Sequence, residues 1–249
     1  MLKDERYDKI LEFLETETYV SSLELAKRLF VSMPTIRRDL AYLEKSKRLV
    51  RSHGGARKIK SEHTVTPLDF RQSVNHLEKK QICNLAKQFL KDDSVVFLDG
   101  STTVMQLAEY ILPKQNITVI TNGLPTSLTL IKNGIKTYST GGELQKNSLA
   151  YAGSFAEEFI RKFNIDVCFF SSHGVNGDGF IVDTSLGETQ LRNTAISKSE
   201  KSVFLCDKSK FNANAPYNLI PLNDVDWVVT DFTEADKLPY LSPNKIITT

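Results

Sequence analysis

The chain contains only three cysteines, Cys83, Cys168 and Cys206, and they are widely separated. Their number is odd and no two of them have the spacing of a metal-binding motif, so the sequence predicts no metal site. Cys168 and Cys206 lie inside apolar runs, where a cysteine is expected to act as a small buried side chain.

Long apolar segments are also missing. No uninterrupted apolar run is long enough to cross a bilayer, and residues 1–6 lead into a charged amphipathic helix rather than a signal peptide. The G-x-x-x-x-G-K-[ST] pattern of a phosphate-binding P-loop does not occur. We therefore expect a cytoplasmic protein with no membrane partner, and no motif predicts a cofactor.

The net charge of +2 conceals an uneven distribution. Residues 1–60 contain 14 lysines and arginines against 9 acidic residues, whereas residues 61–249 contain 18 against 21. The excess is greatest in residues 27–60, with 11 basic and 2 acidic residues. This asymmetry suggests a polyanionic partner for the N-terminal part alone, although charge by itself fits a solvated basic face equally well. A length of 249 residues favours two domains.

Apolar spacing predicts three short helices near the N-terminus. The first covers residues 4–17, and the second and third begin at Ser21 and at Ser32. A glutamate three residues after Ser21 completes a capping box, and a proline two residues after Ser32 suits a first helical turn. Leu49–Arg57 then has the pattern of a β-like run with a glycine turn. Three helices followed by a basic hairpin predict a winged helix-turn-helix over residues 1–57.

In a helix-turn-helix the third helix enters the major groove. We expect base or phosphate contacts near its start, from Ser32, Met33, Thr35, Arg37 and Arg38. Further contacts, mainly to phosphates, are expected from residues later in this domain: Lys45, Lys47, Arg48, Arg51, His53, Gly54, Gly55 and Arg57. Asp39 has the wrong charge for this role and is expected to orient a neighbouring arginine. An arginine pair on a solvated face is the alternative for Arg37 and Arg38.

Residues 58–76 lack clear periodicity and are predicted to form a linker. From residue 77 onward, strand-like and helical patterns alternate, which predicts an α/β domain with a parallel sheet over 77–249. The expected strands are 95–98, 117–120, 136–138, 166–170, 203–206 and 227–229. The expected helices are 77–90, 103–112, 124–132, 149–163 and 186–199.

Polar segments follow five of these strands, and ligands of open α/β sheets bind at the carboxyl ends of strands. The first segment, Asp99, Gly100, Ser101, Thr102 and Thr103, resembles an anion cradle because it combines a close turn, hydroxyl groups and a following helix. We expect further effector contacts from Asn122, Gly141, Gly142 and Lys210. Ordinary polar turns are the alternative for any one segment, but five together favour a small polar ligand carrying a phosphate.

Several of these motifs resemble the DeoR family of bacterial transcriptional regulators. They are TIRRDL and HGGA in the N-terminal part, then LDGSTT, TNG, GGEL, the turn over 174–179, GETQL and DKSKF. The resemblance implies a sugar-phosphate-sensing domain related in fold to ribose-5-phosphate isomerase, and it adds His173 and Glu188 to the candidate effector residues. Ser171-Ser172-His173 and the order Gly100-Ser101 depart from the family pattern.

We interpret the chain as a transcriptional repressor of sugar-metabolism genes that is not an enzyme and has no catalytic residues. Its expected partners are double-stranded operator DNA, a phosphorylated sugar, and other copies of itself in a homodimer or homotetramer. One alternative is a sugar-phosphate isomerase fused to a DNA-binding domain, with a base drawn from Asp99, Glu143, Asp183, Glu188 or Asp207. Another is a second domain that only oligomerises.

Overall fold

The computed structural model describes residues 2–17, 19–46, 48–52, 54–58 and 68–248, and the predicted contacts of Lys47 and His53 lie outside these ranges. The chain forms two compact units, Met1–Val74 and Asn75–Thr249. Their boundary lies within the segment 58–76 that the sequence predicts to be a linker. In the described part of that segment, α4 (Leu68–Ser73) forms a helix that the sequence analysis does not predict.

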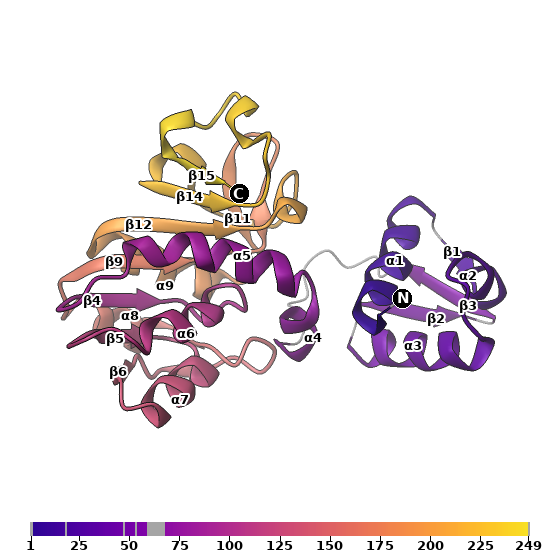
Figure 1. The fold of residues 1–249 in the computed structure, drawn as a ribbon, viewed down its shortest axis with the longest axis horizontal. Coiled ribbons are helices and arrows are strands. Elements are labelled where there is room, and N and C mark those ends of the chain that lie inside the picture. Colours follow the sequence, from indigo (N-terminus) through magenta and orange to yellow (C-terminus); the bar gives the residue numbers. More distant parts are fainter. Residues whose placement is uncertain (1, 18, 47, 53, 59–67, 249) are drawn as a thin grey trace. The chain divides into compact units, whose positions relative to one another are not determined.

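The N-terminal unit is a winged helix-turn-helix, as predicted (Figure 1). Its elements are α1 (Lys3–Thr16), β1 (Tyr19–Ser21), α2 (Ser22–Arg28), α3 (Met33–Lys45), β2 (Leu49–Ser52) and β3 (Gly55–Lys58). The three strands pair antiparallel in the order β1-β3-β2. Apolar side chains from all three helices and from the sheet share one core.

Local sequence explains where α3 begins and which face it buries. The Ser32 side chain caps the helix by accepting from the Thr35 backbone N–H, and Pro34 occupies the first turn. The apolar stripe of α3 is fully buried. Asp39 is also buried and makes two hydrogen bonds with the Arg6 guanidinium of α1, at 2.6 and 3.0 Å. The arginine that Asp39 orients is therefore Arg6, whose position 33 residues earlier is not evident from sequence.

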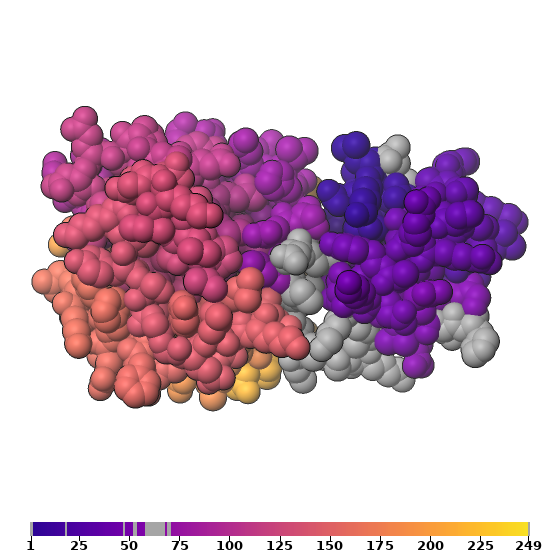
Figure 2. Space-filling model, turned by 90° about the horizontal axis from the view of Figure 1, so that it is seen from below, coloured from indigo at the N-terminus to yellow at the C-terminus, as the bar shows by residue number. Residues whose placement is uncertain are grey.

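The C-terminal unit contains a seven-stranded sheet in the order β15-β14-β12-β9-β4-β5-β6, with every pair parallel. Its strands are β4 (Val95–Leu98), β5 (Thr118–Thr121), β6 (Lys136–Ser139), β9 (Ile165–Phe170), β12 (Ser199–Cys206), β14 (Trp227–Thr230) and β15 (Ile246–Thr248). Figure 2 views this unit from the side of β6, at the opposite end of the sheet from β15.

Helices cover both faces of this sheet. They are α5 (His76–Ala86), α6 (Ala108–Ile111), α7 (Leu124–Lys132), α8 (Ser154–Ile160) and α9 (Leu186–Ser197), with a 3₁₀ turn (Val104–Leu107) leading into α6. Alternate strand residues enter different cores, since Val96 and Leu98 pack with α5 and α6 whereas Phe97 packs with α8 and α9. Both faces of the strands are therefore buried, which accounts for their continuous apolar runs.

Several parts of the sequence-based prediction need correction, beginning with the seventh strand of the parallel sheet, β15, which was not predicted. The helix predicted over 149–163 is wrong at its start, because β8 (Tyr151–Ala152) pairs antiparallel with β7 (Glu143–Leu144) before α8 begins. The helix predicted over 103–112 is a 3₁₀ turn followed by one short α-helical segment. A second sheet was not predicted, formed by β10 (Gly174–Val175), β11 (Phe180–Asp183) and β13 (Tyr217–Pro221).

Candidate DNA-binding surface and effector site

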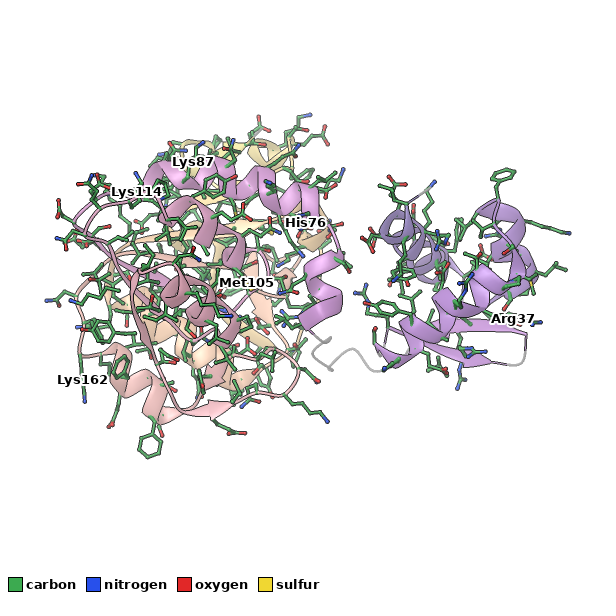
Figure 3. All side chains as sticks on the ribbon, turned by 60° about the horizontal axis from the view of Figure 1, so that its bottom comes forward. Arg37, His76, Lys87, Met105, Lys114 and Lys162 are labelled. Atoms are coloured by element: carbon green, nitrogen blue, oxygen red, sulfur yellow. The ribbon has the colours of Figure 1, made fainter. Side chains whose placement is uncertain are left out.

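The exposed side of α3 carries the predicted DNA-contacting residues. Arg37 and Arg38 are exposed on this helix, and Figure 3 labels Arg37. Met33 and Thr35 are half-buried at its start, where the Ser32 and Thr35 hydroxyls lie 2.9 Å apart. The helix therefore presents two exposed guanidinium groups beside a polar N-terminus, although Arg38 Nε also donates to the Pro34 carbonyl at 3.4 Å.

The wing contributes two more exposed cations and two glycines with different roles. Arg51 and Arg57 are exposed on β2 and β3, and Arg51 lies 3.9 Å from the Glu44 carboxylate. Gly54 forms the exposed turn with a φ of +81°, a conformation that favours glycine. Gly55 is buried, and a Cβ there would lie 2.3 Å from the Val20 carbonyl oxygen. Gly55 therefore shapes the wing from within.

Arg48 differs from the other cations expected to hold phosphates. Its side chain is half-buried, and loss of hydration lowers its pKa to about 10, while the carboxylates of Asp8 and Glu15 on α1 oppose that shift. Arg48 thus faces the first helix, and we assign it to the packing of the domain.

In the C-terminal unit, the five polar segments follow strands that are direct neighbours in the sheet, in the order β12-β9-β4-β5-β6. Along the chain, β5 and β6 are added on one side of β4. The later strands, β9, β12, β14 and β15, are added on the other side of β4. The topological switch point therefore lies between β4 and β9. In open α/β sheets this is where a ligand-binding crevice forms.

A buried ion-pair network lies beneath this point. Arg192 of α9, 4% exposed, donates to Asp99 Oδ2 at 2.8 Å, Asp183 Oδ2 at 2.7 Å and Glu188 Oε2 at 2.9 Å. Burial lowers the pKa of Arg192, but the attraction of Asp183, Asp99 and Glu188 outweighs it and raises the pKa overall. The carboxylate of Asp99 also accepts from the backbone N–H groups of Ser101 and Ser171. These groups anchor the first loop to its neighbours.

Asn122 and Gly100 are likewise engaged within the protein. The Asn122 side-chain oxygen accepts from the Gly100 N–H at 2.8 Å, and its amide donates to the Tyr151 carbonyl at 2.9 Å. A Cβ at Gly100 would lie 2.6 Å from the Ala150 Cβ and 3.3 Å from the Gly123 Cα. Glycine at position 100 is therefore required by close packing, which explains the Gly100-Ser101 order.

The hydroxyl groups of the cradle differ in what they contact. The Ser101 hydroxyl accepts from the Val104 N–H, and the Thr102 hydroxyl lies 3.3 Å from the ammonium group of Lys79, a residue of α5 that is 4% exposed. The Thr103 side chain is fully buried, and its Oγ1 has no hydrogen-bond partner among the described residues. A buried hydroxyl without a partner costs about 1–3 kcal/mol, so the loop contains an unmet hydrogen-bonding capacity.

Lys210 reaches the same edge from the segment after β12. Its ammonium group donates to Ser171 Oγ at 2.7 Å and to the Ser172 carbonyl at 2.8 Å, both at the end of β9. Within the described residues, it has no ion pair with a carboxylate. A half-buried ammonium group bound to neutral oxygens is suited to binding an anion.

His173, Gly141 and Gly142 lie around this region. His173 reaches solvent, yet partial desolvation lowers its pKa; Asp183 opposes this shift and Lys210 adds to it. Gly141 has a φ of +65° with open space beside its Cα, whereas a Cβ at Gly142 would lie 2.7 Å from the Ala152 carbonyl oxygen. Gly142 therefore allows β7 and β8 to pack closely, and Gly141 faces open space.

Sequence reasoning missed three residues at this edge. Lys79 is one of two adjacent lysines, and only helical packing shows that it is the buried one. Ser148 is 2% exposed, and its hydroxyl has no hydrogen-bond partner in the part of the chain that the structure describes. Its segment pairs with the end of β5 through the Gly123–Ala150 bridge. Arg192 stands four residues after Glu188. This spacing on a helix indicates an ion pair between the two side chains, and it is the one signal for Arg192 that the sequence offers.

The part of the chain that the structure describes offers neither a metal site nor a membrane span. In these residues, no group of three or more histidine, cysteine or acidic side chains could hold a metal ion. No helix within the described ranges has the length and apolar character needed to cross a membrane.

Comparison with known proteins gives a family match in each part of the chain. Residues 6–62 match the DeoR-like helix-turn-helix domain, and residues 74–232 match the DeoR C terminal sensor domain. A transcriptional regulator of Bacillus subtilis, YulB, is 34% identical over 93% of this chain and 90% of its own length. The glycerol-3-phosphate regulon repressor of Escherichia coli is 31% identical over 93% of this chain and 92% of its own length.

Among solved structures, ribose 5-phosphate isomerase from Plasmodium falciparum is similar with a TM-score of 0.40 and 15% identity, covering 55% of this chain and 53% of the isomerase. The two DeoR domains and the two relatives agree with the motifs and with the fold. The chain belongs to the DeoR family and is a DNA-binding transcriptional regulator rather than an enzyme.

Proposed function

We propose that the chain is a repressor of sugar-metabolism genes whose operator binding is controlled by a phosphorylated sugar or a related metabolite. The metabolite binds at the carboxyl edge of the sensor domain, between β4 and β9. The repressor acts in the cytoplasm as a homodimer or homotetramer, whose symmetry matches repeated half-sites in the operator.

One observation carries the proposal for the effector site. Among the residues that the structure describes, the switch point combines a fully buried Thr103 hydroxyl without a hydrogen-bond partner and a half-buried Lys210 ammonium group bound to neutral oxygens. A phosphate group supplies both the acceptor oxygens and the negative charge that these two groups lack. We assign direct effector contacts to Ser101, Thr102, Thr103 and Lys210, with sugar contacts from Gly141, His173 and Ser148.

We assign Asp99, Glu188 and Asn122 a supporting role, because their side chains are engaged by other parts of the protein. The same argument bears on catalysis. An isomerase base needs a carboxylate available to the substrate, but Asp99, Asp183 and Glu188 are all bound by Arg192. Asp207 accepts from Asn75 and Ser209, so Glu143, which is exposed on β7, is the one candidate base left without such an argument. Binding without turnover therefore suits this edge.

For the DNA-binding domain, we propose that Arg37 and Arg38 contact bases or phosphates in the major groove, with Met33 and Thr35 beside them. Arg51 and Arg57 on the wing bind phosphates. These four exposed guanidinium groups are four of the 11 basic residues in residues 27–60.

Thermal unfolding of the full chain with a panel of sugar phosphates tests the effector site. A ligand present at 100 times its dissociation constant stabilises the native state by about 2.7 kcal/mol, whereas the corresponding unphosphorylated sugars should have no effect. Lys210→Met should abolish the response. Lys208→Met is the matched control, because Lys208 lies in the same 3₁₀ turn with an exposed side chain. If no phosphorylated compound stabilises the wild-type chain, or if Lys210→Met responds as the wild type does, the proposed site is wrong.

A further inference from the structure

We propose that Asn75 is a positioning residue that couples occupancy of the effector site to the DNA-binding domain. The inference rests on the proposed effector site and concerns how that site is read out. Asn75 is the first residue of the sensor domain and directly follows Val74, the last residue of the N-terminal unit. Any change transmitted along the backbone to the DNA-binding domain passes through this residue.

The Asn75 side chain is bound to the loop that carries Lys210. Its amide donates to Asp207 Oδ1 at 3.0 Å and to Ser209 Oγ at 2.9 Å. Asp207 is 1% exposed and also accepts from the Ser209 backbone N–H, so the contact reaches a fixed part of the loop. Asn75 itself has φ and ψ of 51° and 38°, a left-handed conformation that few residues other than glycine and asparagine adopt readily.

Three further contacts join α5 to the cradle after β4. His76 lies 3.3 Å from the Gln106 amide in the 3₁₀ turn that follows the cradle, and Figure 3 shows His76 at the start of α5. The Lys79 ammonium group contacts the Thr102 hydroxyl at 3.3 Å, and the Cys83 thiol donates to the Thr103 carbonyl at 3.1 Å. The first two turns of α5 are therefore bound to the cradle, while Asn75 is bound to the loop of Lys210.

An anion that draws Lys210 and the Thr102–Thr103 segment together therefore acts on both ends of this set of contacts. The contacts from α5 to the cradle move with one side of the site, and the contacts from Asn75 move with the other. The backbone at Asn75 must then adjust, because Asn75 directly precedes α5 and its side chain is bound to the loop of Lys210. Such a residue supplies the differential contacts that coupling between two sites requires.

The test compares the full-length wild type with Asn75→Gly. Glycine accepts the left-handed conformation, so this change removes the two side-chain hydrogen bonds without straining the backbone. Asn116→Gly is a matched control, since Asn116 also has a positive φ of 52° and its amide donates to Asp93 at 2.7 Å, in the segment just before β5. If Asn75→Gly does not fold, Ser209→Ala removes one of the two acceptors instead.

Two readouts are measured with saturating inorganic phosphate as the probe. Amide hydrogen exchange is followed in peptides covering residues 75–83 and 99–104, and affinity is measured for a DNA fragment selected by the wild-type chain. In the wild type and in Asn116→Gly, phosphate should slow exchange in 99–104 and change it in 75–83. It should also change DNA affinity by a factor in the range of about 5 to 150 that is usual for coupled sites.

In Asn75→Gly, phosphate should still slow exchange in 99–104, and DNA affinity without phosphate should be unchanged. The response of 75–83 and the change in DNA affinity should both be lost. A response in Asn75→Gly equal to that of the wild type overturns the role of Asn75. A wild type that is protected at 99–104 without any response at 75–83 also overturns it and leaves the effector site intact. Absence of protection at 99–104 in the wild type overturns the effector site itself.

Discussion

Replacing Arg192 by methionine removes the one cation that three buried carboxylates share. Breaking a buried ion pair by deleting one partner costs about 3–5 kcal/mol, because the other charge stays buried and uncompensated. Here Asp99, Asp183 and Glu188 lose their partner together, and all four side chains are less than a tenth exposed. We therefore expect a loss at the upper end, about 5 kcal/mol, from a total stability that is typically about 5–15 kcal/mol.

Urea unfolding followed by tryptophan fluorescence measures this loss in the sensor domain alone, because Trp227 of β14 is the only tryptophan in the chain. With a urea dependence of about 1–3 kcal/mol per molar, the midpoint should fall by roughly 2 M. Arg192→Lys should lose less stability than Arg192→Met, because lysine keeps the positive charge. It should still be less stable than the wild type, because lysine cannot donate in a planar fork to several carboxylates.

Arg161→Met is the control for this experiment. Arg161 pairs with Glu157 at 3.1 Å, but its side chain is 53% exposed, and exposed pairs contribute about 0–1 kcal/mol. A loss below about 1 kcal/mol in Arg192→Met would refute the interpretation of this network as a buried structural anchor. Its carboxylates would then have to be reconsidered as ligand-binding or catalytic groups.

Three other changes test separate parts of the account. Arg37→Ala and Arg38→Ala should each weaken operator binding by about 1–3 kcal/mol in a mobility-shift assay with an unchanged melting temperature, and unchanged affinity in both would exclude them from the interface. Gly100→Ala should destabilise the sensor domain by about 1–3 kcal/mol in urea, because its Cβ would lie 2.6 Å from that of Ala150; wild-type stability would contradict the packing argument. Burial, aided by Glu109, raises the pKa of Cys83 to about 12. Iodoacetamide at pH 8 should therefore label this thiol only after unfolding, which mass spectrometry detects.

The raised pKa of Cys83 also predicts a direction for alkaline stability. The thiol in the unfolded chain ionises near its ordinary pKa of about 8.5, whereas the native thiol stays protonated. The free energy of unfolding should therefore fall as the pH rises from about 8.5 toward 12. Labelling of the native protein at pH 8 at the rate of the unfolded chain would contradict the burial of this thiol.

Local signals in the sequence were sufficient for much of the architecture. The strand at Val95–Leu98 and the helix at Leu124–Lys132 have the predicted bounds, because an apolar run and a Gly-Leu-Pro start leave few alternatives. Ser32 and Ser21 cap their helices as predicted. The parallel order of the sheet explains why the five polar segments follow neighbouring strands and lie at one edge.

The features that the sequence did not reveal depend on contacts between distant residues. Tyr151–Ala152 continues the helical apolar spacing of the segment after it, but pairing with β7 makes it a strand. Arg192 lies 93 residues from Asp99, so the carboxylate that looked available for an effector could not be recognised as an ion-pair partner. Lys79 and Ser148 became candidate site residues only once their burial was known.

The central claim is that a phosphorylated metabolite at the carboxyl edge of the sensor domain controls DNA binding. The most direct measurement is the affinity of the full chain for its selected operator, titrated with sugar phosphates and repeated for Lys210→Met. We expect at least one compound to change the wild-type affinity by about fivefold or more. Lys210→Met should bind the operator equally well and show no response. No effect of any phosphorylated compound on the wild type, or an equal response in Lys210→Met, would contradict the account.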